Sequence, residues 1–476
     1  MGNSHSSPAQ TCLLSAMGND PSLVAFAGQP FYQAVAVQPY NLNIPVSPMA
    51  VTFPETSQQI ADIVKCAADY GYKVQARSGG HSYGNYGLGG NEDTVTVDLK
   101  NFQQFSMDNS TYEATIGSGM LLGDVSPRLY DAGKRAMAHG VCPQVGSGGH
   151  FTIGGLGPLS RQWGTALDHV QEVEVVLANS SIVRASDEQY QDVFFAVKGA
   201  GASFGIVTEF KVRTQRAPEQ AVRYMYRFNM GSTAERAQMF KDWQSFVSKP
   251  ELSRKFSTLL TIMEGTVILS GQFYGSKEEF DQLGFEQHFS LDQPGQVTVI
   301  NDWLAMAGPS IESLALQIGG GIPTHFYAKS LAFAPETLMP TRTVDDLIHY
   351  LDKAEKGSLL WFINFDLEAG AINDVPANAT AYPHRDVLYW AQTYIVNLFG
   401  AVPQTSLDFL DGINELVAKS VPGACDKAYP GYVDPFMTNA QEAYWRSNLP
   451  KLQEVKAAVD PDDVFHYPQS VSGAKT

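Results

Sequence analysis

Two glycine-rich segments of the chain each contain one side chain that can form a covalent bond. The first spans 77–90, reads RSGGHSYGNYGLGG and contains His81; the second spans 140–164 and contains Cys142. Glycine has no Cβ, so backbone N–H groups in such segments can approach a phosphate closely. An imidazole or a thiol inside the segment could then react with the bound molecule. The two segments together favour a large, phosphorylated and tightly held ligand.

Other kinds of site fit these segments less well. Neither contains the G-K-[ST] of a P-loop. A third stretch, GAGASFG at 199–205, spaces its last glycine one residue beyond the dinucleotide fingerprint, and a predicted strand follows where a helix is needed. His139 and His150 beside Cys142 do not make a regular zinc ligand set. We therefore expect no metal site, and Cys142 lacks the signature of a thiol protease.

Short strands and helices alternate around these segments and must position them. Apolar alternation predicts strands, and 3.6-residue periodicity predicts helices. The expected strands are 49–56, 72–78, 94–99, 112–119 and 204–214, with a hairpin over 169–186. The expected helices are 57–71, 121–133 and 187–199. This part of the chain is predicted to be α+β, with strands of mixed direction.

A second domain is expected to begin near residue 216. Longer strands and amphipathic helices follow there, with candidate segments at 218–230, 258–274 and 386–398. The last forty-odd residues return to a helix, a proline stop and a polar tail. A chain of 476 residues exceeds what one hydrophobic core usually supports. We therefore predict domains at 1–215 and 216–428, with a segment at 429–476 that returns to the first domain.

Composition excludes several classes of partner. The 32 Lys and Arg against 49 Asp and Glu give a net charge of −17, which repels nucleic acid. No apolar run is long enough for a transmembrane helix. The N-terminus shows no signal peptide, so the chain is expected outside the cell if it is a mature form and in the cytoplasm otherwise. We expect a monomer that acts on a small molecule.

Four cysteines are too few for a disulfide scaffold. Cys12 lies in a short apolar N-terminal segment, and Cys66 lies in the predicted helix 57–71. Either the two form a disulfide that holds the N-terminus, or they are two buried thiols.

The two glycine-rich segments resemble the flavin-attachment segments of the FAD-linked oxidases of the vanillyl-alcohol oxidase superfamily. The similarity is greatest to the branch of berberine bridge enzymes and fungal oligosaccharide oxidases. It covers nearly the whole chain, including the ending YWRSNLPKLQEVKAAVDPDDVF at 444–465. The resemblance implies a PCMH-type FAD-binding domain of two α+β subdomains and an inserted substrate domain, in which helices cover an antiparallel sheet.

The resemblance also implies bicovalent FAD. His81 would bind the flavin 8α-methyl group, and Cys142 would bind flavin carbon 6. Val145, three residues after Cys142, matches the small residue that gives oxygen access to the flavin in oxidases of this branch. The other implied cofactor residues are Arg77, Ser78, Gly79, Gly80, Ser82, Gly149, His150, Gly155, Ile206 and Gln469.

A catalytic pair is implied in the same way. WFINFD ends in Asp366, and YPGYVD places Tyr432 as the base that removes a proton from a substrate hydroxyl. The implied substrate contacts are Tyr83, Gln272, Phe362, Asn364, Gln392 and Tyr429. Phe362 and Asn364 replace the Trp and Gln of glucan-oxidising relatives.

These residues predict an FAD-dependent oxidase. We expect it to convert the anomeric hydroxyl of a sugar or oligosaccharide to a lactone while O2 is reduced to H2O2. The alternative is an oxidase or dehydrogenase of a secondary-metabolite alcohol. A flavin-binding protein without catalysis would have no need for Asp366 and Tyr432.

Overall fold

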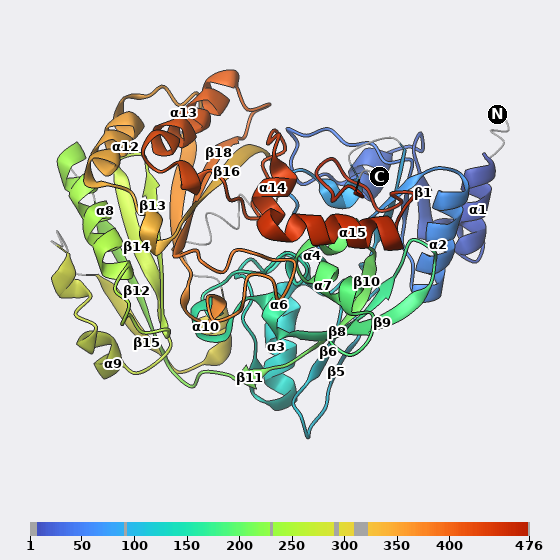
Figure 1. Cartoon of the computed structure of the whole chain (residues 1–476), viewed down its shortest axis with the longest axis horizontal. Helices are drawn as coiled ribbons and strands as arrows, with labels where there is room; N and C mark the ends of the chain where they lie inside the picture. The colour runs from blue at the N-terminus through green and yellow to red at the C-terminus, as the bar shows by residue number, and fades with distance from the viewer. Residues whose placement is uncertain (1–6, 90–92, 229–231, 290–294, 309–321, 475–476) are drawn as a thin grey trace.

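The computed structural model describes residues 7–89, 93–228, 232–289, 295–308 and 322–474, and its strands form sheets in two halves of the molecule (Figure 1). The first half contains a four-stranded sheet in the order β1 (Val24–Phe26), β2 (Ala50–Thr52), β4 (Thr94–Asp98) and β3 (Lys73–Arg77). It also contains a five-stranded sheet ordered β5 (Phe105–Met107), β6 (Ala114–Gly117), β10 (Ile206–Val212), β8 (Val170–Val176) and β9 (Ile182–Ser186). β2, β3 and β4 are parallel and the five-stranded sheet is antiparallel, so strand direction is mixed as predicted.

The second half is built on a seven-stranded antiparallel sheet. Its order is β15 (Gln296–Ile300), β12 (Ala221–Phe228), β14 (Thr266–Phe273), β13 (Phe256–Met263), β17 (Leu360–Leu367), β18 (Tyr389–Asn397) and β16 (His325–Phe333). The helices α8 (Thr233–Val247), α12 (Thr341–Lys353) and α13 (Gln404–Ser420) cover one face (Figure 1). β13 and β14 pair directly with each other in antiparallel fashion, so the candidate segment 258–274 is a β-hairpin. Its turn uses Gly265, whose φ of +64° suits a residue without Cβ.

Two helices of the first half begin at side-chain caps, which the sequence supplies at Ser7 and Thr56. The Thr56 hydroxyl accepts from the Gln59 backbone N–H at 3.2 Å, which starts α2 (Ser57–Asp69). The longer helices of this half also include α1 (Pro8–Ala16), α3 (Leu122–Gly133) and α7 (Gln191–Ala200). The short elements of this half are α4 (Ser147–His150), α5 (Ser160–Trp163), α6 (Ala166–His169), β7 (Arg135–Ala136) and β11 (Gln215–Arg216). The second half has the short helices α9 (Lys277–Gln282) and α10 (Trp303–Ala307). The fold class is α+β.

A disulfide joins Cys12 to Cys66, with Cα atoms 5.9 Å apart. It holds α1, which the sequence did not predict as a helix, against α2. The disulfide alternative is therefore confirmed.

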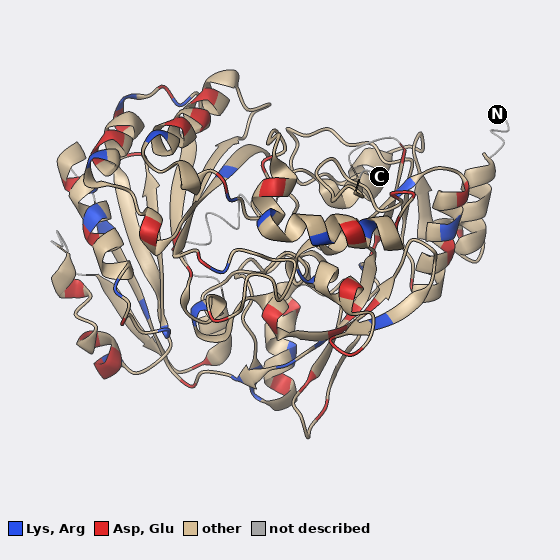
Figure 2. Ribbon diagram, viewed as in Figure 1, with Lys and Arg blue, Asp and Glu red and all other residues tan. Residues whose placement is uncertain are grey.

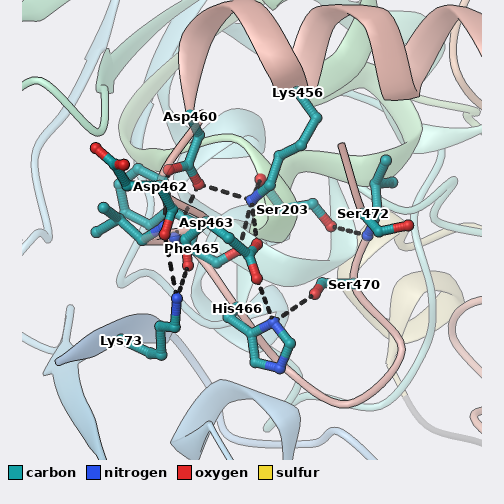
Figure 3. Close-up of polar contacts among 12 residues, drawn as sticks. Lys73, Ser203, Lys456, Asp460, Asp462, Asp463, Phe465, His466, Ser470 and Ser472 are labelled. Carbon is teal, nitrogen blue, oxygen red and sulfur yellow. Dashed lines mark hydrogen bonds and ion pairs between the residues drawn. The ribbon is translucent and has the colours of Figure 1, made fainter. Parts of the chain in front are cut away.

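The C-terminal segment returns to the first half. The helices α14 (Ala440–Trp445) and α15 (Leu449–Val459), red in Figure 1, lie over the blue and green elements, and α15 contacts α7. Figure 3 shows the buried Lys456 ammonium at the centre of this contact. It donates to Asp460 at 2.6 Å and to the Ser203 carbonyl at 2.8 Å, and it pairs with Asp463 at 3.0 Å.

Charged residues are spread over both halves of the molecule, and acidic and basic positions alternate along its helices and strands (Figure 2). Within the described ranges, no helix has the length and apolarity needed to span a bilayer.

Candidate active site

One large cavity extends from the glycine-rich segments of the first half to the seven-stranded sheet of the second half. Its volume is about 1120 Å³, which exceeds the roughly 300–1,000 Å³ of common small-molecule pockets. His81, Cys142, Asp366 and Tyr432 all line it. Residues predicted from four separate stretches of sequence therefore meet in one cavity.

Strand alternation divides the seven-stranded sheet between its core and this cavity. In β17, Ile363 and Phe365 pack into the core beneath the helices, whereas Phe362, Asn364 and Asp366 line the cavity. Successive side chains of a strand point to opposite faces, so the second set shares the open face.

The two glycine-rich segments lie in backbone contact. A Cβ on Gly79 would come within 2.4 Å of the Gln144 carbonyl oxygen, and one on Gly146 within 2.1 Å of the Gly79 nitrogen. Glycine is therefore required at both positions. The Ser78 hydroxyl connects the segments further, because it donates to the Ser118 carbonyl at 2.6 Å and accepts from Gly148 N at 3.3 Å.

The His81 ring lies beside Tyr40 in the cavity wall. Its ring centroid lies 4.6 Å from that of Tyr40, and the structure shows no hydrogen bond from the imidazole to any described residue. Burial lowers the pKa of His81 to about 4, so the ring is neutral near pH 7 and a nitrogen lone pair is available.

Cys142 lines the cavity from the second glycine-rich segment and is a free thiol. Its sulfur makes one weak contact, with Gln144 Oε1 at 3.5 Å. Burial raises the pKa of the Cys142 thiol, while the backbone N–H groups of Gln144 and Val145 oppose that shift. His150 is not a further nucleophile, because its Nε2 accepts from Gly140 N at 2.8 Å.

Most of the predicted cofactor residues line the cavity, and four differ from the simple expectation. The cavity wall includes Ser78, Gly79, Gly80, Ser82, Val145, Gly149 and His150. Arg77 also lines it, but its guanidinium binds Asp98 and the carbonyls of Ala36 and Val37, so only other parts of Arg77 can face a ligand.

Gly155, Ile206 and Gln469 lie outside the cavity wall. The Gly155 N–H donates to the Tyr429 hydroxyl at 2.9 Å, and Ile206 packs in the core of the four-stranded sheet. The Gln469 amide donates to the Asp434 carbonyl at 2.8 Å and accepts from the Tyr444 hydroxyl at 2.9 Å. These three residues therefore contribute to the packing and hydrogen bonding around the cavity and not to its surface.

The glycine-lined end of the cavity fits FAD. A dinucleotide of this size needs a large cavity, and its pyrophosphate needs backbone N–H groups without obstructing side chains. No atom lies within 4 Å of a Cβ built on Gly149, so the wall is open there. The residues 199–205 also contribute Gly199, Gly201 and Gly205 to the wall.

Asp366 and Tyr432 form an electrostatically coupled pair at the other end. Burial raises the pKa of Asp366 to about 7. Burial, and then the charge of Asp366, raises the pKa of the Tyr432 phenol. The Tyr432 ring stacks on Tyr83 with centroids 6.3 Å apart and meets Tyr429 edge-on at 5.0 Å. The two groups are therefore close enough for the charge of Asp366 to act on the Tyr432 phenol.

The predicted substrate residues all line the cavity, but several of their polar atoms are already bonded. Gln392 Nε2 donates to the Tyr83 hydroxyl at 2.9 Å, and Asn364 Oδ1 accepts from Thr261 Oγ1 at 2.7 Å. Gln272 Nε2 donates to the Met306 carbonyl at 3.1 Å, while its Oε1 is buried without a partner among the described residues.

Three residues of the site escaped the sequence analysis. Tyr40 and Trp390 line the cavity, and Glu368 lies buried two positions after Asp366. Alternation along the strand could have indicated Glu368, because side chains two apart share a face. Nothing in the local pattern marks Tyr40. In the described part of the chain, no group of three or more His, Cys, Asp or Glu side chains could hold a metal ion.

Two family models match this chain, one in its first half and one in its C-terminal segment. A model described as an FAD binding domain matches residues 48–186, and one described as berberine and berberine like matches 428–472. The first covers His81 and Cys142, and the second covers Tyr429 and Tyr432.

Relatives match over almost the full chain. An FAD-linked oxidoreductase, sorD of Penicillium rubens, is 41% identical and covers 97% of this chain and 98% of its own length. The xylooligosaccharide oxidase of Thermothelomyces thermophilus is 31% identical, covering 90% of this chain and 87% of its own.

Solved structures agree with the fold. The xylooligosaccharide oxidase of Myceliophthora thermophila, solved with xylobiose, matches with a TM-score of 0.87 and 30% identity, covering 99% of this chain and 100% of its own. The glucooligosaccharide oxidase of Acremonium strictum, described with a 6-S-cysteinyl, 8α-N1-histidyl FAD, matches with a TM-score of 0.87 and 28% identity over 99% and 100%.

The fold and the cavity therefore define a flavoprotein oxidoreductase. The chain belongs to the family of FAD-linked oxidases that includes the berberine bridge enzyme-like proteins and the fungal oligosaccharide oxidases.

Proposed function

We propose that this protein is an FAD-dependent oxidase that converts a CH–OH group to a carbonyl and passes the electrons to O2, forming H2O2. The observation that carries the proposal is the position of Asp366 and Tyr432 on the same cavity as His81 and Cys142. Oxidation of an alcohol must remove a hydride from carbon and a proton from oxygen. Bound FAD supplies the hydride acceptor, and the Asp366–Tyr432 pair takes the proton.

The pair takes up that proton in two linked transfers, from the substrate to Tyr432 and from Tyr432 to Asp366. Tyr432 accepts a hydrogen bond from the substrate hydroxyl, and its own phenolic proton moves to the Asp366 carboxylate as the hydroxyl proton is removed. Asp366 is suited to this because burial already disfavours its charge.

We further propose that FAD is attached at both His81 and Cys142. His81 and Cys142 both line the cavity, and the close backbone approach of Gly79 to Gln144 and Gly146 brings their two segments together. Val145, which lines the same wall, is the small residue that we expect to admit O2.

The first substrate candidate is the anomeric hydroxyl of a sugar or oligosaccharide, with a lactone as product. The aromatic residues Tyr83, Phe362 and Tyr429 support it, as do Gln272 Oε1, which has no partner among the described residues, and the relatives named oligosaccharide oxidases. The second candidate is a secondary-metabolite alcohol. The bonded amides of Asn364 and Gln392 favour it, because fewer polar groups remain for sugar hydroxyls.

The variants Tyr432→Phe and Asp366→Asn test the proposed proton acceptor. We expect each to lower kcat by roughly 10²–10⁴-fold, because proton transfer in the transition state is lost while the cavity keeps its shape. Oxygen consumption should be measured with glucose, cello-, xylo- and chito-oligosaccharides and with aryl alcohols. Tyr190→Phe, an exposed tyrosine in the first half, is the matched control and should keep full activity. Full turnover by Tyr432→Phe would remove Tyr432 as the base.

A further inference from the structure

The floor of the cavity is a ladder of side-chain pairs between β17 and β18. The register places Asp366 opposite Trp390, Asn364 opposite Gln392, Phe362 opposite Tyr394 and Leu360 opposite Val396. All eight residues line the cavity. With about 3.4 Å per residue in an antiparallel strand, six residues carry the ladder roughly 20 Å from the carboxylate to Leu360.

The ladder changes from polar to apolar with distance from Asp366. The second pair consists of amides, which are bonded to Thr261 and Tyr83. The third pair stacks its rings at 5.0 Å, and Met263 lies opposite Phe362 on the neighbouring strand. The fourth pair is aliphatic. Apart from the Tyr394 hydroxyl, the hydrogen-bonding side chains of this ladder are therefore confined to its inner two pairs.

An exposed apolar patch continues the ladder at its outer end. We define the apolar lip as Leu359, Leu360, Leu398 and Phe399, which lie at the start of β17 and just beyond the end of β18. Their exposures are 94%, 48%, 57% and 95%. Because Leu360 pairs with Val396, the residues before β17 and after β18 come to the same edge of the sheet. Leu359, Leu360 and Leu398 also line the cavity.

Contiguous exposed apolar side chains usually mark a binding surface. The occupant of this surface is restricted by its continuity with the cavity, since the lip and the Asp366–Tyr432 pair are two ends of one floor. A linear oligosaccharide would place hydroxyl groups against Leu360, Val396 and the lip, where the floor offers no polar side chain to receive them.

We propose that the apolar lip and the outer two pairs of the ladder bind the alkyl or aryl part of an amphipathic alcohol whose CH–OH group lies at Asp366 and Tyr432. This inference rests on the proposed oxidation of an alcohol and specifies its substrate class. The distance from Asn364 to Leu360, four residues or about 14 Å, sets the length of the apolar part.

A homologous series of alcohols tests the substrate class with the flavin-loaded enzyme. The series is 4-methyl-, 4-butyl- and 4-octylbenzyl alcohol, measured by oxygen consumption. We expect kcat/KM to rise at least about tenfold from the butyl to the octyl compound, because the longer chain extends to Leu360 and the lip and each buried methylene contributes to binding. The double variant Leu359→Ser, Leu398→Ser should remove most of that gain. Ile182→Ser changes an exposed apolar residue on β9 that does not line the cavity, and it should keep the gain.

A binding measurement that needs no turnover separates this inference from the proposed activity. The neutral fluorophore N-phenyl-1-naphthylamine should brighten on binding to the wild type and to Ile182→Ser, and at least threefold less with the lip variant. Equal brightening of all three proteins would overturn the inference, as would a kcat/KM that rises with sugar length and not with alkyl length. If no alcohol is oxidised while the lip variant alone loses fluorophore binding, the proposed activity fails and the apolar site stands.

Discussion

At the scale of single residues, the site depends on a carboxylate whose charge is disfavoured by its surroundings. Asp366 lies on the cavity face of β17, where burial raises its pKa to about 7. Glu368 lies just beyond the end of that strand, and its pKa is raised well above the ordinary range, first by burial and then by the charge of Asp366. One Glu368 oxygen has no partner among the described residues. Burial therefore disfavours the charge of Glu368, and of the two carboxyl groups Asp366 is the one that lines the cavity.

The pH dependence of turnover follows from the pKa of Asp366. The proton acceptor must be ionised, so kcat/KM should rise with pH through a value near 7 and fall about tenfold per unit below it. Oxygen consumption from pH 5 to 9, with an alcohol that the enzyme oxidises, measures this. Glu368→Gln resembles the protonated acid and should keep the same profile. A kcat/KM that falls as pH rises from 5 to 7 would contradict the assignment of Asp366.

The sequence predicted which residues belong to the site, but it did not predict all of their contacts. His81, Cys142, Asp366 and Tyr432 were predicted through the family resemblance, and all four line one cavity. Arg77 illustrates the limit, because its buried partner Asp98 is 21 residues away and nothing local indicates that the guanidinium is already paired.

At the scale of elements, one helix connects the returning chain end to a cavity wall. Lys456 of α15 is fully buried and donates to the Ser203 carbonyl, within the 199–205 stretch whose glycines line the cavity (Figure 3). The same ammonium binds Asp460 and the Phe465 carbonyl. It therefore holds the chain on both sides of the turn after α15.

Removing this buried ammonium should destabilise the protein strongly. Lys456→Met leaves the buried Asp460 carboxylate without its cation, which costs roughly 3–5 kcal/mol. Lys451→Met in the same helix removes an exposed pair with Asp192 and should cost at most about 1 kcal/mol. Urea unfolding followed by tryptophan fluorescence compares the two. Equal losses would show that Lys456 contributes no more than a surface lysine.

Elements with strong periodicity could be predicted from sequence, and their pairing could not. The predicted helix 57–71 is α2, and the predicted strand 94–99 is β4, because each has a clear apolar pattern. The register that sets Asp366 opposite Trp390 joins positions 24 residues apart, and no local pattern specifies it. The ladder of the cavity floor therefore became visible only in the structure.

At the scale of the whole molecule, the cavity needs all three parts of the chain. The glycine-rich segments come from the first half, Asp366 from the seven-stranded sheet, and Tyr429 and Tyr432 from the segment that leads back to α14 and α15. We propose domain boundaries at 215/216 and 428/429 on this basis. A cofactor attached at two points of the first half can stay fixed while the sheet side is left open to substrate.

The intact mass of the acid-unfolded protein tests the central claim, that FAD is held through His81 and Cys142 in this cavity. We predict that one FAD remains attached to the wild type and to each of His81→Ala and Cys142→Ala, and that the double variant carries none. Peptide mapping should then locate the flavin on the peptides that contain these two residues. Release of all yellow colour from the acid-precipitated wild type into the supernatant would contradict covalent attachment.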